Sequence, residues 1–203
     1  MRAQDTRSAI LGAAVELGSL RGLEELSIGR LASTVEMSKS GLFAHFGSKE
    51  ELQLATVTRA WEIFETEVVP LAPEGSDDTL EALLERWLSF FERRVLPGGC
   101  FFVISAVELA GLDGPVHDAL VEAVDRQLAA LEVAVRVAND DGELPARKDP
   151  AGTAFALHAI LGNANSLYLV REDAEVFDHA RITIGELLGR PLGSREPAVA
   201  RPA

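Results

Sequence analysis

Apolar residues recur every three or four positions along most of the chain, and no long stretch alternates between apolar and polar residues. A spacing of three and four places apolar side chains on one face of an α-helix, whereas alternation would indicate β-strands. The pattern therefore predicts an all-α fold.

The first fifty residues predict three helices joined by short turns. A helix over about 6–20 is expected to end before Gly22, because glycine readily takes the left-handed backbone angles that stop a helix. Ser27 is placed to cap a short second helix, and Ser38 to cap a third that runs to about His45. A helix followed by two short helices with a tight turn between them is the order of a helix-turn-helix unit.

A long helix is expected to connect this unit to the rest of the chain. Ser48 and Glu51 have the spacing of a capping box, and the helix that they open should stop at Pro70. Asp78 and Asp149 are candidate caps of later helices. Those later helices are expected at about 78–95, 101–112, 115–139, 149–171 and 172–189.

These elements predict two domains and a tail. Residues 1–48 form the helix-turn-helix domain, residues 49–193 a second, helical domain, and residues 194–203 a flexible tail.

Charge is distributed unevenly between these parts. The first fifty residues contain six Lys or Arg and six Asp or Glu, so the whole formal net charge of -13 lies after residue 50. An acidic body disfavours nonspecific contact with nucleic acid, while a neutral N-terminal domain with clustered cations can still approach it.

The window from Met37 to Leu52, "MSKSGLFAHFGSKEEL", has the chemistry of a DNA-reading helix. Such a helix needs a groove-facing side without carboxylates, because the phosphates of DNA would repel them. Leu42 and Phe46 are four apart and can pack inward, which turns Lys39 outward. From the residues alone, a surface helical hairpin with a solvated polar face remains an alternative.

Residues 6–57 strongly resemble the DNA-binding domain of the tetracycline-repressor (TetR) family. The resemblance covers about a quarter of the chain. It rests on a recognition-helix motif, Ser-Lys-x-x-Leu-Phe-x-His-Phe from Ser38 to Phe46, and on Ser-Lys-Glu-Glu-Leu from Ser48 to Leu52. The resemblance implies a dimeric, effector-controlled regulator, in which the helical domain of residues 49–193 binds the effector and forms the dimer.

The resemblance also implies roles for single residues. Ser27 and Thr34 would flank the DNA backbone, and His45 and Lys49 would hold phosphates. Two positions depart from the family pattern, with Glu36 where glycine is common and Gly41 where threonine is common. The predicted DNA-binding set is Ser27, Thr34, Ser38, Lys39, Ser40, Gly41, Phe43, His45 and Lys49.

Aromatic and polar residues in the second domain are candidate contacts for a small lipophilic effector. A cavity of this kind is mostly apolar, with a few polar groups that orient the ligand. Helically spaced aromatic residues are equally typical of a plain core, so that alternative stays open. The candidates are Trp87, Phe90, Phe102, Phe155, His158, Asn163 and Tyr168.

A homodimer is expected for a geometric reason. One short helix reads few base pairs, whereas two helices about 34–36 Å apart read successive major-groove half-sites of a palindromic operator. The last two helices are the candidate interface, where the small residue Gly162 would permit close packing. The candidate contacts are Ala164, Leu167, Ile182, Ile184, Leu187 and Leu188.

The sequence therefore predicts a repressor that binds a palindromic operator and is released by a small molecule. The alternative is a helical small-molecule carrier that has lost operator binding. Catalysis is disfavoured, because the four histidines are scattered and no glycine-rich phosphate loop or Gly-x-Ser-x-Gly motif is present. No cofactor is expected, although a metal site at His117 or His158 with a nearby carboxylate remains an alternative.

Two further expectations concern compartment and redox chemistry. No secretion signal is recognised at the N-terminus, and polar residues interrupt the uncharged stretch 150–170, so we expect a cytoplasmic protein without a membrane span. Cys100 is the only cysteine, which excludes an intramolecular disulfide. A buried thiol and a redox sensor are both open for it.

Overall fold

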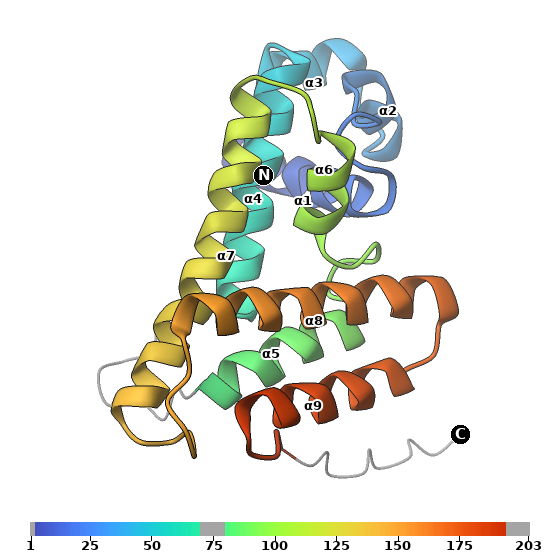
Figure 1. Cartoon of the computed structure of the whole chain (residues 1–203). Coiled ribbons are helices and arrows are strands. Elements are labelled where there is room, and N and C mark those ends of the chain that lie inside the picture. Colours follow the sequence, from blue (N-terminus) through green and yellow to red (C-terminus); the bar gives the residue numbers. More distant parts are fainter. Residues whose placement is uncertain (1–2, 70–79, 194–203) are drawn as a thin grey trace.

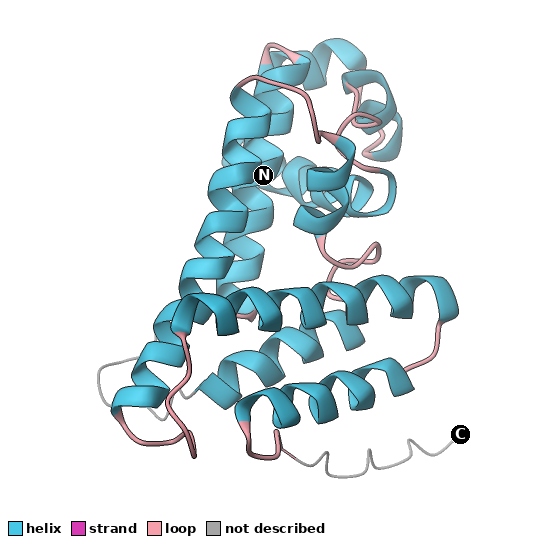
Figure 2. Cartoon of the chain, in the orientation of Figure 1, coloured by secondary structure: helices cyan, strands magenta, loops and turns pink. Residues whose placement is uncertain are grey.

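The structure, a computed structural model, describes residues 3–69 and 80–193, with side chains from Thr6 onward. Within these ranges every regular element is an α-helix, as Figure 2 shows, so the all-α prediction is confirmed. The helices are α1 (Ala3–Arg21), α2 (Ile28–Thr34), α3 (Lys39–Phe46), α4 (Lys49–Glu67), α5 (Leu80–Glu92), α6 (Phe101–Glu108), α7 (Pro115–Asp140), α8 (Pro150–Arg171) and α9 (Glu175–Leu188).

Four predicted helix starts are confirmed by their caps. The side chains of Ser27, Ser38, Ser48 and Asp149 each accept a hydrogen bond, 2.8–3.3 Å long, from the backbone N–H three residues further on. Each bond satisfies one of the N–H groups that a helix leaves unpaired at its start. These local interactions fix where α2, α3, α4 and α8 begin.

Two helices end earlier than their apolar pattern predicts. α5 ends at Glu92, and Arg94 just beyond it has a left-handed backbone with φ 49°. α6 ends at Glu108, before Gly111 at φ 83°. A left-handed residue cannot continue a right-handed helix, so the chain changes direction at both places. The predicted cap Asp78 and the predicted tail lie outside the described residues.

The helices form an N-terminal head and a helical body (Figure 1). α1, α2 and α3 make up the head, and α4 leaves it to run beside α7. α5, α8 and α9 lie at the far end of this pair, with α8 packed on both α7 and α9. α6 packs against α1, so the body meets the head through α6 as well as through α4.

An aromatic cluster fills the centre of the body around Phe64 of α4. Its ring lies edge-on to Trp87 of α5 at 4.8 Å between centroids, to Phe90 at 6.0 Å and to Phe102 of α6 at 6.1 Å. Edge-to-face contacts at these separations are the favoured aromatic geometry. The cluster joins α4, α5 and α6 into one core.

The short loop before α6 is held from two sides. The Gly98 N–H donates a buried hydrogen bond to Ser19 Oγ of α1 at 3.1 Å, and the Cys100 N–H donates to Asn165 Oδ1 of α8 at 3.1 Å. A Cβ on Gly98 would lie 1.8 Å from the carbonyl oxygen of Ser19, so only glycine fits. We call residues 98–100, with Ser19 and Asn165, the junction between head and body.

Candidate nucleic-acid interface and effector domain

The turn before α3 fixes the angle at which this helix leaves the head. Glu36 has φ 54°, in the left-handed region, and the Met37 N–H donates to the Ala32 carbonyl of α2 at 2.9 Å. Glu36, which stands where glycine is common in the family, therefore takes the left-handed backbone conformation of this turn at some conformational cost. Ser38 then caps α3 directly.

α3 has a buried side and an exposed side, as its spacing predicts. Leu42 and Phe46 are buried in the head, and the guanidinium of Arg7 lies 4.8 Å from the centre of the Phe46 ring. Lys39 is exposed, and the Phe43 side chain is 54% exposed. α3 itself contains no acidic residue. Its exposed side can therefore approach a polyanion without like-charge repulsion from its own side chains.

The hydroxyl groups of the predicted DNA-binding set are exposed but already bonded to the head. Ser27 and Ser38 accept the capping bonds, and Thr34 Oγ1 donates to the Arg30 carbonyl at 3.2 Å. Ser40 Oγ lies 3.2 Å from Ser38 Oγ. A serine hydroxyl that accepts a capping bond keeps its own hydrogen for a phosphate oxygen. Contact of these groups with DNA stays a prediction.

The basic members of the set are placed differently from one another. Lys49 Nζ donates to the backbone carbonyl of Glu24 at 3.0 Å and lies 3.4 Å from its carboxylate, at the surface. The Lys39 stem lies over α2, where a Cβ on Gly29 would be 3.2 Å from Lys39 Cε. His45 is half-buried beside Phe46. A phosphate contact by Lys49 therefore competes with its bond to Glu24.

Gly41 lies close to the start of α3. It is half-buried, and a Cβ at this position would be 3.1 Å from Ser38 Oγ. Without a side chain at Gly41, this part of the α3 surface is flatter than it would be with the threonine that is common in the family.

The predicted effector contacts are not gathered in one place. Trp87, Phe90 and Phe102 are buried in the aromatic cluster around Phe64. Phe155 differs from the prediction, because its side chain is 71% exposed on the outer side of α8 and does not join this interior group. A sequence pattern could not separate these cases, since interior and interface positions are both apolar.

The other three candidates also separate. Asn163 is exposed on α8, while His158 is half-buried and turned toward α7, with its Nε2 3.3 Å from Gln127 Oε1. Burial lowers the pKa of His158. The Tyr168 ring lies 4.8 Å from that of Phe177 and under the guanidinium of Arg94 at 4.9 Å. An effector role for each of them stays a prediction.

An open groove of about 460 Å³ lies between α4, α5 and α7. The Arg126 guanidinium lies over the Trp61 ring at 5.2 Å, and Val133 and Val137 line the wall from α7. None of these residues is among the predicted effector contacts. The sequence signal for them is the four-residue spacing of the two valines on the predicted helix 115–139, and in the structure both are about half exposed.

The outer faces of α8 and α9 expose apolar side chains. Val170 and Ile182 are 84% and 60% exposed, and Leu167 is partly exposed. Ile184 and Leu188 are instead fully buried inside the chain, so their prediction as interface contacts is wrong. Ile184 and Leu188 are four positions apart on α9, so they lie on the same side of the helix, and that side faces the interior.

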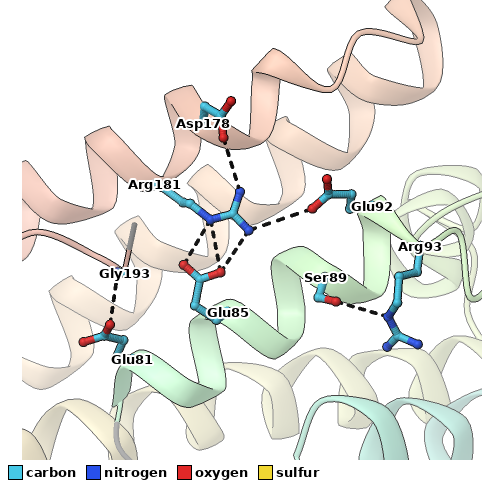
Figure 3. Close-up of polar contacts among 8 residues, drawn as sticks. All are labelled: Glu81, Glu85, Ser89, Glu92, Arg93, Asp178, Arg181 and Gly193. Atoms are coloured by element: carbon cyan, nitrogen blue, oxygen red, sulfur yellow. Dashed lines mark hydrogen bonds and ion pairs between the residues drawn. The ribbon is translucent and has the colours of Figure 1, made fainter. Parts of the chain in front are cut away.

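An ion-pair network holds the inner side of α9 on α5 (Figure 3). The Arg181 side chain is nearly buried and forms two-pronged hydrogen bonds with Glu85 at 2.9–3.1 Å. Glu92 and Asp178 lie within ion-pair distance of the same guanidinium. Bidentate arginine–carboxylate pairs fix orientation as well as distance. The outer face of α9 is thereby presented away from the body.

Cys100 lies inside the junction and not at the surface. Its side chain is buried, and burial raises the pKa of its thiol. Reactive cysteines are exposed and have a lowered pKa, so the buried-thiol interpretation fits this geometry.

The described residues hold neither a group of metal-binding side chains nor a helix that could span a membrane. Among the side chains of residues 6–69 and 80–193, no three His, Cys, Asp or Glu are grouped so that they would hold a metal ion. None of the described helices has the length and apolar character needed to cross a bilayer.

Known proteins with similar sequence support this architecture. HTH-type transcriptional repressor NemR of Escherichia coli K12 is 22% identical over 190 residues, which cover 92% of this chain and 96% of NemR. A TetR transcriptional regulator from Chloroflexus aurantiacus superposes with a TM-score of 0.80 at 26% identity, over 93% of this chain and 96% of that one. AibR, solved with isovaleryl coenzyme A and operator DNA, superposes with a TM-score of 0.68 at 23% identity, over 91% and 99%.

Both parts of the chain match the same family. Residues 10–56 match "Bacterial regulatory proteins, tetR family", and residues 77–184 match "Tetracyclin repressor-like, C-terminal domain". The first match contains α2 and α3, and the second contains α5 to α8 and most of α9. The chain therefore belongs to the tetR family of bacterial regulatory proteins.

Proposed function

We propose that this chain represses transcription by binding a palindromic operator as a dimer, and that a small-molecule effector releases it. The observation that carries the proposal is the geometry of α3. Its buried side is anchored by Leu42 and Phe46, and its exposed side presents Lys39 and Phe43 without an acidic residue in the helix. A rigid helix with this surface fits the major groove.

The outer faces of α8 and α9 are the proposed dimer interface. Phe155, Leu167, Val170 and Ile182 expose apolar area there, and apolar area at this scale is typical of a surface that a partner covers. Pairing through these faces would hold two heads at a fixed distance. Operator spacing then follows from the dimer.

Effector control is supported by the way the body meets the head. α6 carries Glu108, whose Oε1 accepts a hydrogen bond from the Glu24 N–H at 3.1 Å, and the loop before α6 is fixed by the junction. A molecule that binds a second arrangement of the body better would change these contacts and move α3. AibR, with its ligand and operator DNA in one structure, is a family precedent for both partners.

Binding to a fluorescent duplex of the upstream intergenic region tests the proposal, with a scrambled duplex beside it at several salt concentrations. We expect specific binding that persists at moderate salt, and loss of sequence preference in Lys39→Ala. Arg147→Ala is the charge-matched control, because Arg147 is exposed on the loop between α7 and α8. Equal, salt-sensitive binding to both duplexes would favour the carrier alternative.

A further inference from the structure

Three buried, uncharged side chains in the body each have an N–H group without a hydrogen-bond partner among the described residues. These groups are Trp87 Nε1 of α5, Gln127 Nε2 of α7 and Asn165 Nδ2 of α8. All three residues are at most 2% exposed. Buried N–H groups in folded proteins are nearly always paired, so three unpaired ones within a single domain require an explanation.

A continuous series of contacts links these three groups. The His158 ring lies edge-on to Trp87 at 6.0 Å, and its Nε2 lies 3.3 Å from Gln127 Oε1. The Cys100 thiol lies beside Gln127, and the Cys100 N–H donates to Asn165 Oδ1. His158 and Asn165 are two turns apart on the inner side of α8. The unpaired N–H groups therefore belong to one polar strip in an apolar interior, which consists of Trp87, Cys100, Gln127, His158 and Asn165.

The polar strip carries no formal charge at neutral pH. Burial lowers the pKa of His158, which keeps its imidazole neutral, and burial raises the pKa of Cys100, which keeps its thiol protonated. Trp87, Gln127 and Asn165 do not ionise. A charged ligand would lose its hydration here without gaining an opposite charge. The strip offers hydrogen-bond donors and a neutral, apolar surrounding.

We infer that Trp87, Gln127 and Asn165 recognise an uncharged, largely apolar effector through its carbonyl oxygens, which accept the unpaired hydrogen bonds. The inference rests on the proposed function, because it names the effector class of the same body. Of the five residues in the strip only His158 reaches the surface. Access therefore lies between α7 and α8 beside its imidazole, and the two helices separate there when the ligand enters.

The position of Asn165 connects this site to the head. Its Oδ1 holds the Cys100 N–H, and Gly98 in the same short loop is bonded to Ser19 of α1. A carbonyl oxygen that draws the Asn165 amide toward the ligand would weaken its bond to Cys100. The loop would then shift against α1, which is the direction of effect that release from an operator needs.

A matched series of probes tests the inference on the full-length protein. Fluorenone has a carbonyl, fluorene lacks it, and fluorenone carboxylate adds a negative charge to the same ring system. Calorimetric titration should show that fluorenone binds about tenfold tighter than either of the other two. Equal affinity for fluorenone and fluorene, or no binding of fluorenone, would overturn the inference. Preference for the carboxylate would also overturn it and would point to the groove beside Arg126.

Conservative variants separate recognition from folding. Gln127→Met removes an unpaired donor with little change in volume and should weaken fluorenone about threefold to tenfold while leaving fluorene unchanged. Trp87→Phe removes a donor together with the five-membered ring, so it should weaken fluorenone more than fluorene. Trp61→Phe is the matched control, since Trp61 lies in the groove between α4 and α7 and not in the strip. Equal losses for fluorenone and fluorene in both variants would contradict the assignment.

Operator binding, measured on the same preparation without probe, distinguishes the two proposals. Specific DNA binding without fluorenone binding would overturn the effector class and leave the repressor proposal standing. Fluorenone binding without specific DNA binding would do the reverse.

Discussion

Ser19 Oγ in α1 accepts a buried hydrogen bond of 3.1 Å from the backbone N–H of Gly98, in the loop that leads into α6. Ser19 Oγ also donates to the Glu16 carbonyl at 2.8 Å, so the hydroxyl is used in both directions. The bond ties the last turn of α1 to the body over a sequence separation of 79 residues. The head is therefore attached through backbone groups as well as through α4.

Gly98→Ala should destabilise the fold by about 2–3 kcal/mol, because the new Cβ would overlap backbone atoms that cannot move aside. Its nearest neighbour would be the Ser19 carbonyl oxygen at 1.8 Å. Urea denaturation measures the change. Gly12→Ala in α1 is the control, since nothing lies within 4 Å of its added Cβ. That variant should gain about 0.5–1 kcal/mol from helix propensity, and equal effects at the two sites would contradict the junction.

Lys49→Ala should weaken binding similarly on all DNA sequences and lower the slope of log affinity against log salt by about one. The structure adds a second expectation, because Lys49 pairs with Glu24 at the surface. Loss of an exposed pair changes folding stability by less than about 1 kcal/mol. Fluorescence anisotropy at several salt concentrations gives the slope, and an unchanged slope would remove Lys49 from the phosphate contacts.

Ile182→Glu and Ile184→Ala should fail in different ways. Ile182 is exposed on the outer face of α9, so a charge there should raise the dimer dissociation constant by about tenfold to a hundredfold. Ile184 is buried in the chain, and its truncation should cost about 2–4 kcal/mol of folding stability. Analytical ultracentrifugation and urea denaturation separate the two effects. Val107→Glu is the control, because Val107 is exposed on α6 and lies outside the proposed interface. A folded Ile182→Glu dimer with wild-type affinity would place the interface elsewhere.

Cys100 should react slowly with a disulfide reagent in the native protein and rapidly in urea. Burial raises the pKa of its thiol, so the folded state lacks thiolate at neutral pH and continues to lack it when the unfolded chain begins to ionise. Because the folded pKa is the higher one, the thiol's contribution to stability is fully present at neutral pH. It is lost as alkaline pH rises through the unfolded and then the folded pKa. Native reaction as fast as in urea would support redox sensing instead.

The local features of the head could be predicted from the sequence because their causes are local. Ser38 caps α3 through the N–H three residues on, and the four-residue spacing of Leu42 and Phe46 decides which side is buried. The same holds for Asp149 and α8. Caps and periodicity involve neighbours in the chain, so a pattern of residues contains them.

The body could be predicted less well, because its features depend on tertiary contacts. Phe155 and Phe102 are both apolar helix residues, yet one is exposed and the other buried. Gln127 gave no signal, since a single glutamine on a long helix is typical of a surface position. Its burial follows only from the packing of α7 against α8. Pairing between distant helices, and hence the polar strip, is not encoded in any short motif.

The junction has a consequence for which mutations abolish the effector response. The donors of the two junction bonds are backbone N–H groups at Gly98 and Cys100, and only a substitution by proline would remove one of them. The acceptors are the side chains of Ser19 and Asn165, which many substitutions would remove. Substitutions at Ser19 or Asn165 therefore break the link between body and head more readily than loss of a loop N–H does. A genetic screen for variants that no longer respond to the effector should therefore return single-codon changes at Ser19 and Asn165, in proteins that still fold.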